Sequence, residues 1–462
     1  MTEQGCNDPR EKRHRLKAGG AMKSLAPEVV GAVIAHPVHQ TNRARIEILI
    51  EQLRSCKEPA DYNEFQRHLF KAVYEIEERR SQCSRIVKRL RKGESLPVDR
   101  PALSNDSDPS VLATWEFELF VYERLARQLR TVGDGLAWRC FGYDRRLILA
   151  LSRNESPGMM YGKEGLPFEL GRVNHLWEDR GHFTLLHDLT NCLRIADLSE
   201  FTADGGILLH EVKKNPQADR SAQMKRIEAA VNAVMHGGTL PGDQLDARLV
   251  ELTEPYVVNL KQLNDLLQLA KQHGCRGMRL PQGRALFATS IPDNYNRWKG
   301  NPDAGMAASD SARLRAIKRA GIDKAMHHIQ GFSGDTAARS PIMAPWSIYP
   351  FSSEDCSALI CDLLGFQTIL SVDALVDSLT AVGLHADILL NPADGDLSGD
   401  KKVLRAWLDN RSLTLHAEGL NVLLYELLEP DAWARGVLET LSVETRPGSP
   451  GVVFADEAAS WL

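Results

Sequence analysis

Apolar residues that recur every three or four positions predict amphipathic helices in the first third of the chain. One is expected over Thr41–Ser55, and a longer one over Asp61–Lys92 has the spacing of a helical hairpin or a dimer seam. A third is expected over Pro109–Arg130, with Gly133 as its stop signal. The N-terminal part is therefore expected to be helical.

The pattern changes between Leu193 and Lys214. Two short β-like runs, Leu193–Phe201 and Ile207–Lys214, are separated by Asp204-Gly205-Gly206, which is a tight-turn signal. The turn predicts a β-hairpin. Apolar spacing then predicts a helix over Asp219–His236, and Arg248–Val258 is expected to add a further strand to the same sheet.

The rest of the chain alternates between the two patterns. A helix over Asn259–His273 and a hairpin of Gly277–Leu280 with Arg284–Ile291 precede a polar boundary at Pro292–Ser309. Beyond it we expect helices over Ala312–Ile329, Cys356–Leu370, Val372–Val382 and Asn421–Leu441, and strands over His385–Asn391 and Asn410–Leu415. These elements predict an α/β protein of three regions, namely 1–108, 109–292 and 310–462, the last of them α+β.

Length and composition are those of a globular protein of two or three domains, with 462 residues, 43% hydrophobic and 25% charged. A net charge of −5 means that contact with nucleic acid would depend on local basic patches. The basic tail 1–25 and the span Arg79–Lys92 are candidates, and Arg85, Lys88 and Arg89 are the phosphate contacts we expect in that span. The alternative is a solvated tail and a helix end favoured by the helix dipole.

The eight cysteines are scattered without CxxC pairs, so no zinc site is expected. No signal peptide and no apolar run of membrane-spanning length is evident. We therefore expect a cytoplasmic protein with reduced thiols and no membrane partner.

The candidate chemistry lies in the hairpin, where Asp197 is on one strand and Glu211-x-Lys213 is on the next. A hairpin can bring all three to one sheet edge, where two carboxylates suit a hard divalent cation and the ammonium suits a phosphate oxygen or an attacking water. The alternative is a solvated hairpin in which Glu211 and Lys213 form a surface pair of little energetic value.

The order Asp197, Glu211, Lys213 resembles the motif of the PD-(D/E)xK, or restriction-endonuclease-like, nucleases. The resemblance implies a mixed-sheet core flanked by helices, and Mg²⁺ as cofactor with Mn²⁺ able to substitute. It implies metal ligation by Asp197, Glu211 and the carbonyl of Val212.

Further residues are assigned by the same resemblance. Glu118, with Glu116 or Glu123 as alternatives, would complete the metal shell from the preceding helix. Gln223 would orient water or phosphate, and Arg226 and Lys214 would contact the nucleic-acid backbone.

The implied function is metal-dependent hydrolysis of phosphodiester bonds, with DNA as the expected substrate and RNA as the alternative. The implied role is restriction or phage defence, and a second copy or a partner subunit is expected. Two alternatives stay open. One is an inactive nuclease fold that binds nucleic acid or regulates a partner. The other is a helical scaffold that uses the first ninety residues as its dimer seam.

Overall fold

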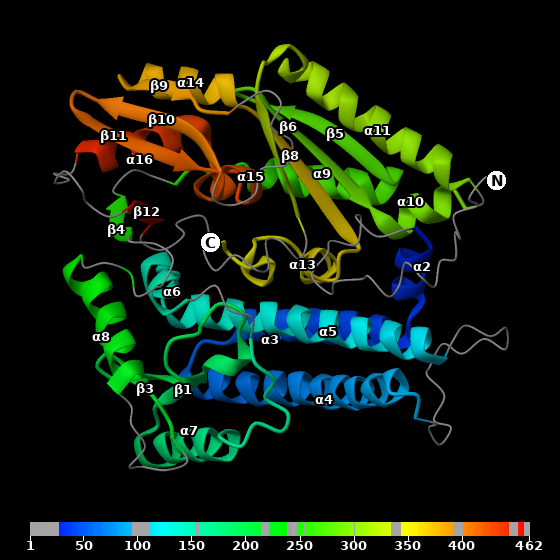
Figure 1. Ribbon diagram of the computed structural model, residues 1–462, viewed down its shortest axis with the longest axis vertical. Coiled ribbons are helices and arrows are strands. Elements are labelled where there is room, and N and C mark those ends of the chain that lie inside the picture. Colours follow the sequence, from blue (N-terminus) through cyan, green and yellow to red (C-terminus); the bar gives the residue numbers. More distant parts are fainter. Residues whose placement is uncertain are drawn as a thin grey trace.

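A computed structural model of the chain describes residues 27–94, 111–152, 157–213, 221–237, 240, 247–252, 256–299, 301–333, 343–390, 401–442 and 451–456. The basic tail 1–25 and Lys214 lie outside these residues. Within them the protein is a mixed α/β structure, as the sequence predicts. Helices form one half of the molecule, and most of the sheet structure forms the other (Figure 1).

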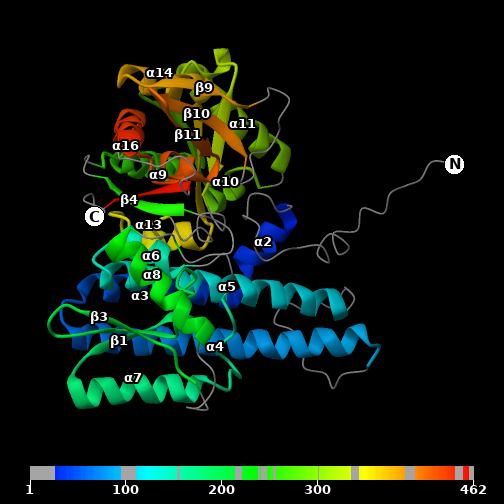
Figure 2. The ribbon, with the colours of Figure 1, turned by 60° about the vertical axis from the view of Figure 1, so that its left-hand side comes forward.

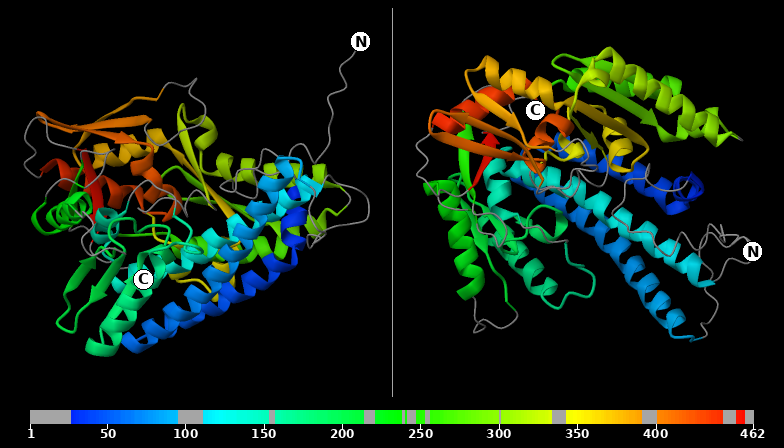
Figure 3. Two further views of the ribbon diagram at one scale, coloured as in Figure 1. Left: turned by 60° about the horizontal axis from the view of Figure 1, so that its bottom comes forward. Right: turned by 45° about the horizontal axis from the view of Figure 1, so that its top comes forward.

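The helical half is built from α2 (Pro27–Ala35), α3 (Pro37–Ser55), α4 (Pro59–Arg91) and α5 (Val111–Cys140). Helix α4 begins where expected, because Glu58 and Asp61 form a reciprocal capping box and Pro59 occupies the first turn. Figures 1 and 3 show α4 and α5 side by side along most of their length. The predicted amphipathic helices are confirmed here.

Helix α5 does not stop at Gly133, as the sequence suggested, but continues to Cys140. A Cβ at Gly133 would overlap the carbonyl oxygen of Leu189, and one at Gly135 would overlap the hydroxyl of Ser347. Both glycines therefore allow other segments of the chain to pack closely against α5.

The predicted hairpin forms from β2 (Leu198–Phe201) and β3 (Ile207–His210), with Leu198 opposite His210 and Phe201 opposite Ile207. Gly205 supplies the positive φ of +83° that the turn requires. Strand β1 (Phe183–Leu186) pairs antiparallel with β2, so this sheet is antiparallel throughout rather than mixed. Helices α6 (Arg145–Leu151) and α7 (Leu166–Arg180) precede the sheet.

Strand β4 (Ala247–Leu252) does not extend this sheet, which corrects the expectation for Arg248–Val258. It pairs in parallel with β12 (Gly451–Asp456), close to the C-terminal end of the chain. Helix α8 (Ser221–His236), which comes between β3 and β4, contacts α6 and β4 and stands beside the hairpin (Figure 2).

A second sheet has the order β5-β6-β8-β7 and is antiparallel. Its strands are Cys275–Leu280, Arg284–Ser290, Leu364–Ser371 and His328–Phe332 in that order. Because β6 hydrogen-bonds to β8, the expected division between residues 292 and 310 falls inside one sheet and is corrected. Helices α9 (Leu260–His273) and α11 (Pro302–Arg319) pack on this sheet, and α10 (Ile291–Arg297) fills part of the supposed boundary.

Two expected helices are each a helix followed by a strand. The segment Cys356–Leu370 contains the end of α13 (Ser353–Ile360) and then β8, while Ala312–Ile329 contains the end of α11 and the start of β7. Pairing with distant strands determines which parts of these segments are strands, because a short apolar run is compatible with either a helix or a strand.

The remaining strands form a third antiparallel sheet, β11-β10-β9. Its strands are Arg411–His416, Lys402–Leu408 and His385–Ile388, and the helices nearby are α14 (Val372–Ala381), α15 (Asn421–Tyr425) and α16 (Pro430–Ser442). The predicted strands at 385–391 and 410–415 are therefore confirmed, and the helix expected over 421–441 is divided in two.

Buried ion pairs join the two halves. Arg145 on α6 makes two hydrogen bonds to Glu426, at 2.9 and 2.7 Å, and Arg124 on α5 pairs with Asp362. All four side chains are almost fully buried. The hydrophobic core is continuous from α2 to α16. No helix among the described residues combines the length and the apolar character needed to cross a membrane.

Candidate functional site

Asp197, Glu211 and Lys213 lie where the hairpin strands open beyond their last pair, Leu198 and His210. Ala196 has a φ of +66°, which turns the chain just before Asp197. The backbone N–H of Asp197 donates to the carbonyl of His210 at 2.9 Å. We refer to these three residues as the candidate site.

The structure places Asp197 next to the segment that carries Glu211 and Lys213. The N–H of Val212 donates to Asp197 Oδ2 at 2.8 Å, and Lys213 forms an ion pair with Glu211. Burial raises the pKa of Asp197 above its usual value; the bond from Val212 opposes this rise and the negative charge of Glu211 adds to it. Two carboxylates thus sit within electrostatic reach of each other in a partly buried place.

Lysine 163 also reaches the candidate site, which the sequence did not predict. It lies in the segment between α6 and α7, and its Nζ is 2.7 Å from Asp188 Oδ2 and 3.9 Å from Asp197 Oδ1. It is also 2.8 Å from Oε1 of the buried Glu169. We call Lys163, Asp188, Glu169 and Asp197 the Lys163 cluster.

The carboxylates around Lys163 stabilise its positive charge. Burial works against the ammonium, but the carboxylates of Asp188 and Glu169 outweigh it and raise the pKa of Lys163 above its usual value. Burial raises the pKa of Glu169, against the lowering effect of Lys163. At neutral pH the cluster therefore contains a cation that holds its acidic neighbours together.

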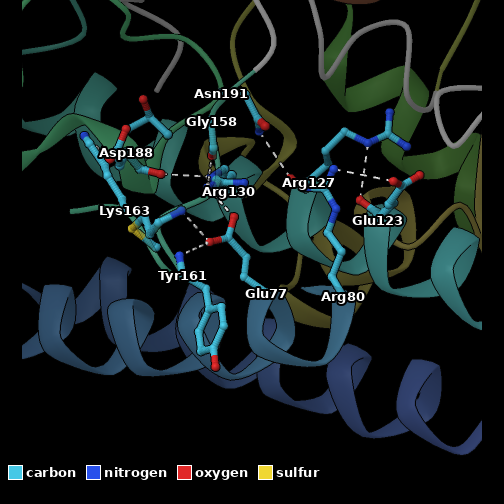
Figure 4. Close-up of polar contacts among 12 residues, drawn as sticks. Glu77, Arg80, Glu123, Arg127, Arg130, Gly158, Tyr161, Lys163, Asp188 and Asn191 are labelled. Atoms are coloured by element: carbon cyan, nitrogen blue, oxygen red, sulfur yellow. Dashed lines mark hydrogen bonds and ion pairs between the residues drawn. The ribbon is translucent and has the colours of Figure 1, made fainter. Parts of the chain in front are cut away.

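Arg130 and Glu77 hold the segments that carry Lys163 and Asp188 (Figure 4). Arg130 donates to the carbonyl of Asp188 at 2.9 Å, to that of Gly158 at 2.9 Å and to Glu77 at 2.6 Å. Glu77 in turn accepts the N–H groups of Met160 at 2.7 Å and Tyr161 at 3.1 Å. One buried ion pair therefore fixes two loops against each other.

Asp134 fixes the following segment in the same manner. Its carboxylate accepts the N–H of Asn191 at 2.6 Å and of Cys192 at 2.9 Å, and the side-chain amide of Asn191 at 2.9 Å. Helix α5 therefore supports the segment that leads into Asp197.

Glu118 is not part of this site, which corrects its expected role. It is buried and its Oε1 lies 3.0 Å from Nε2 of His36. Twelve residues separate it from Arg130 on the same helix, which is about 18 Å. The alternatives also lie elsewhere, because Glu116 pairs with Arg91 at 2.7 Å and Glu123 with Arg80 at 3.4 Å.

The two residues expected on the helix after the hairpin are on α8. Gln223 is half-buried and Arg226 is exposed, and no described contact joins either to Asp197 or Glu211. The carbonyl of Val212 was the expected metal ligand, whereas the described bond from Val212 is the one its N–H makes to Asp197.

The basic span of α4 ends far from the candidate site. Lys88 is eleven residues beyond Glu77, or about 16 Å along the helix, and Figure 1 shows this end of α4 opposite the hairpin. Arg85, Lys88 and Arg89 are exposed, and Arg89 pairs with Glu94 at 2.7 Å. An acidic neighbour therefore neutralises part of the positive charge that was expected to contact phosphate.

The candidate site contains oxygen donors of the kind that bind Mg²⁺. Asp197 and Glu211 supply carboxylate oxygens, and Mg²⁺ commonly binds through one or two carboxylates with water completing its shell. Among the described residues, no three or more His, Cys, Asp or Glu side chains are already gathered to hold an ion. The residues therefore fit Mg²⁺ as a pair of ligands, and they do not form a closed cage.

A search of family models, curated proteins and solved structures finds no match to this chain.

Proposed function

We propose that this protein is a metal-dependent nuclease of the PD-(D/E)xK type that hydrolyses phosphodiester bonds, with DNA as its preferred substrate. The observation that carries the proposal is the meeting of Asp197, Glu211 and Lys213 at one end of the hairpin. Strands β1 to β3, with α5 and α7, would be a reduced version of the restriction-endonuclease-like core.

The residues have distinct roles in this proposal. Asp197 and Glu211 would hold Mg²⁺, or Mn²⁺ in its place, and the N–H of Val212 keeps the Asp197 carboxylate in a fixed orientation. The chemistry that the ion supplies when bound is polarisation of a phosphoryl oxygen and a more acidic water. The ammonium of Lys213 would stabilise the negative charge that develops on the phosphate.

The test is cleavage of supercoiled plasmid DNA by the purified full chain, with Mg²⁺ and with a chelator, and of single-stranded RNA under the same conditions. Lys213→Met keeps the length of the side chain and removes its charge, so cleavage should fall by about a hundredfold. Lys225→Met is the matched control, because Lys225 is an exposed lysine of α8. It should cut like the parent.

Three results would overturn the proposal. The first is a parent protein that cuts neither nucleic acid with Mg²⁺ or Mn²⁺, which would favour a binding or scaffold role. The second is cleavage that persists in the chelator. The third is a folded Lys213→Met variant that cuts at the parent rate.

A further inference from the structure

Lys163 is an ammonium group surrounded by carboxylates from three separate segments. Asp188 lies in the turn after β1, Glu169 in the first turn of α7 and Asp197 at the start of the hairpin, at 2.7, 2.8 and 3.9 Å from Nζ. The Lys163 cluster is thus a place where the fold already binds a cation, and that cation is its own side chain.

The negative charge in this region is only partly balanced. Together, the cluster and the candidate site contain four carboxylates, Asp188, Glu169, Asp197 and Glu211, and two ammonium groups. Oε2 of Glu169 is buried and no described protein group hydrogen-bonds to it. Such an arrangement attracts a further cation.

Lys163 and a divalent ion would need the same oxygen atoms. Asp197 is the carboxylate shared between the Lys163 cluster and the candidate site. An ammonium beside a carboxylate repels a second cation that binds the same carboxylate, because like charges a few ångströms apart repel strongly at a partly buried site. The two cations therefore oppose each other.

The backbone of the segment that carries Lys163 is held in place by buried hydrogen bonds. Arg130 and Glu77 clamp residues 158–161 to the turn that carries Asp188, so the lysine is delivered by a short, well-anchored segment (Figure 4). Its side chain is about one-third exposed, at 32%, which leaves it room to move away from Asp197.

We propose that Lys163 competes with the divalent cation for the carboxylates of Asp197 and Asp188, and so sets the metal affinity of the candidate site. This inference rests on the proposed function, since it concerns the same site. Asp188 is then a carboxylate that the metal gains when Lys163 is displaced.

The experiment is calorimetric titration of Mn²⁺ into the full chain without nucleic acid. Lys163→Met removes the charge at nearly constant length, and Mn²⁺ should bind at least about tenfold more tightly, which corresponds to about 1.4 kcal/mol. Lys163→Arg keeps the charge and should retain the parent affinity. Lys225→Met, at an exposed lysine of α8, is the control for loss of a charge outside the Lys163 cluster.

A melting curve in a chelator shows whether each variant is folded, and a second readout does not depend on cleavage. Without metal, Lys163→Met should melt below the parent, because its acidic neighbours lose their counter-ion. Mn²⁺ should then raise its melting temperature by more than it raises that of the parent. Asp188→Asn should bind Mn²⁺ more weakly than the parent.

The outcomes separate this inference from the proposed function. Equal or weaker Mn²⁺ binding by Lys163→Met, with a parent that cuts DNA, overturns the inference alone. Tighter binding by Lys163→Met, with a parent that cuts nothing, supports the inference and overturns the nuclease proposal. No Mn²⁺ binding by either protein overturns both.

Discussion

The backbone N–H of Val212 donates to the carboxylate of Asp197 across 2.8 Å, and so connects the two strands at the point where they diverge. Val212 is flanked by Glu211 and Lys213, which form an ion pair with each other. One hydrogen bond therefore sets the distance between the acid of the first strand and the acid–lysine pair of the second.

The pH dependence of stability should show the environment of Asp197. Burial raises its pKa above the unfolded value of about 3.9, so its stabilising contribution is complete below that pH and is lost as the pH rises through the folded pKa. Asp197→Asn can still accept the N–H of Val212. In a chelator it should therefore melt above the parent at neutral pH, and the gap should narrow as the pH is lowered toward about 4.

Asp204 in the hairpin turn is a control, because its pKa is shifted in the opposite direction to that of Asp197. Hydrogen bonds from Thr202 and the N–H of Gly206 lower its pKa, so its contribution is present above the unfolded value and is lost as the pH falls. Asp204→Asn should melt below the parent at neutral pH. A fall in melting temperature for Asp197→Asn at neutral pH would contradict the account of its burial.

Removing one partner of the buried pair Arg130–Glu77 should be strongly destabilising. Their side chains are 1% and 0% exposed, so Arg130→Met should lower the free energy of unfolding by about 3–5 kcal/mol, because Glu77 keeps a buried charge. The double variant Arg130→Met/Glu77→Leu should lose less than the sum of the single losses. Chemical denaturation of all four proteins measures this coupling.

The matched control is the pair Arg45–Glu75, at 3.0 Å between α3 and α4 with both side chains more than one-third exposed. Arg45→Met should change the free energy of unfolding by less than about 1 kcal/mol. Additive losses for Arg130 and Glu77 would show that the pair does not act as a unit.

Gly133 should tolerate no side chain. Gly133→Ala places a Cβ against the carbonyl oxygen of Leu189, so α5 or the turn after β1 must shift, and stability should fall by about 3 kcal/mol. Gly171→Ala is the control, because Gly171 is in α7 with no atom near the added Cβ. It should be stabilising by about 0.5–1 kcal/mol. The measurement is the thermal melt of the parent and of both variants. A Gly133→Ala variant as stable as the parent would refute the prediction.

The basic end of α4 should affect binding without affecting chemistry, if it contacts DNA beyond the site. The exposed residues Arg85 and Lys88 would each release counterions, so changing both to Gln should flatten the salt slope of DNA binding by about 0.9 per lost phosphate contact. Arg91→Gln should change the slope less, because Arg91 already pairs with Glu116. The measurement is DNA affinity at several salt concentrations in a chelator.

An unchanged slope for the Arg85 and Lys88 double variant would leave this region as a solvated helix end. Charge reversal at Arg91 would be a poor test, because it also breaks a contact between α4 and α5.

The sequence by itself determined the features that depend on neighbouring residues. The turn Asp204-Gly205-Gly206 and the apolar alternation beside it specify the hairpin, and the apolar spacing specifies α3 and α4. The proximity of Asp197 to Glu211 and Lys213 follows from the hairpin, because strand pairing brings the two ends of the segment together whatever lies around it.

The tertiary structure decided which residues far apart in the chain meet. An amphipathic pattern says that Glu118 is on a helix, but it cannot say that His36 is its partner. The same limit applies to β4, whose partner β12 lies near the end of the chain, and to Gly133, whose neighbour Leu189 explains why it does not end α5. Asp188 lies beside Asp197 because β1 pairs with β2, and the N–H of His187 donates to the carbonyl of Asp197. Lys163 joins them because Arg130 and Glu77 pack its loop against the turn after β1, and no local periodicity encodes such a contact.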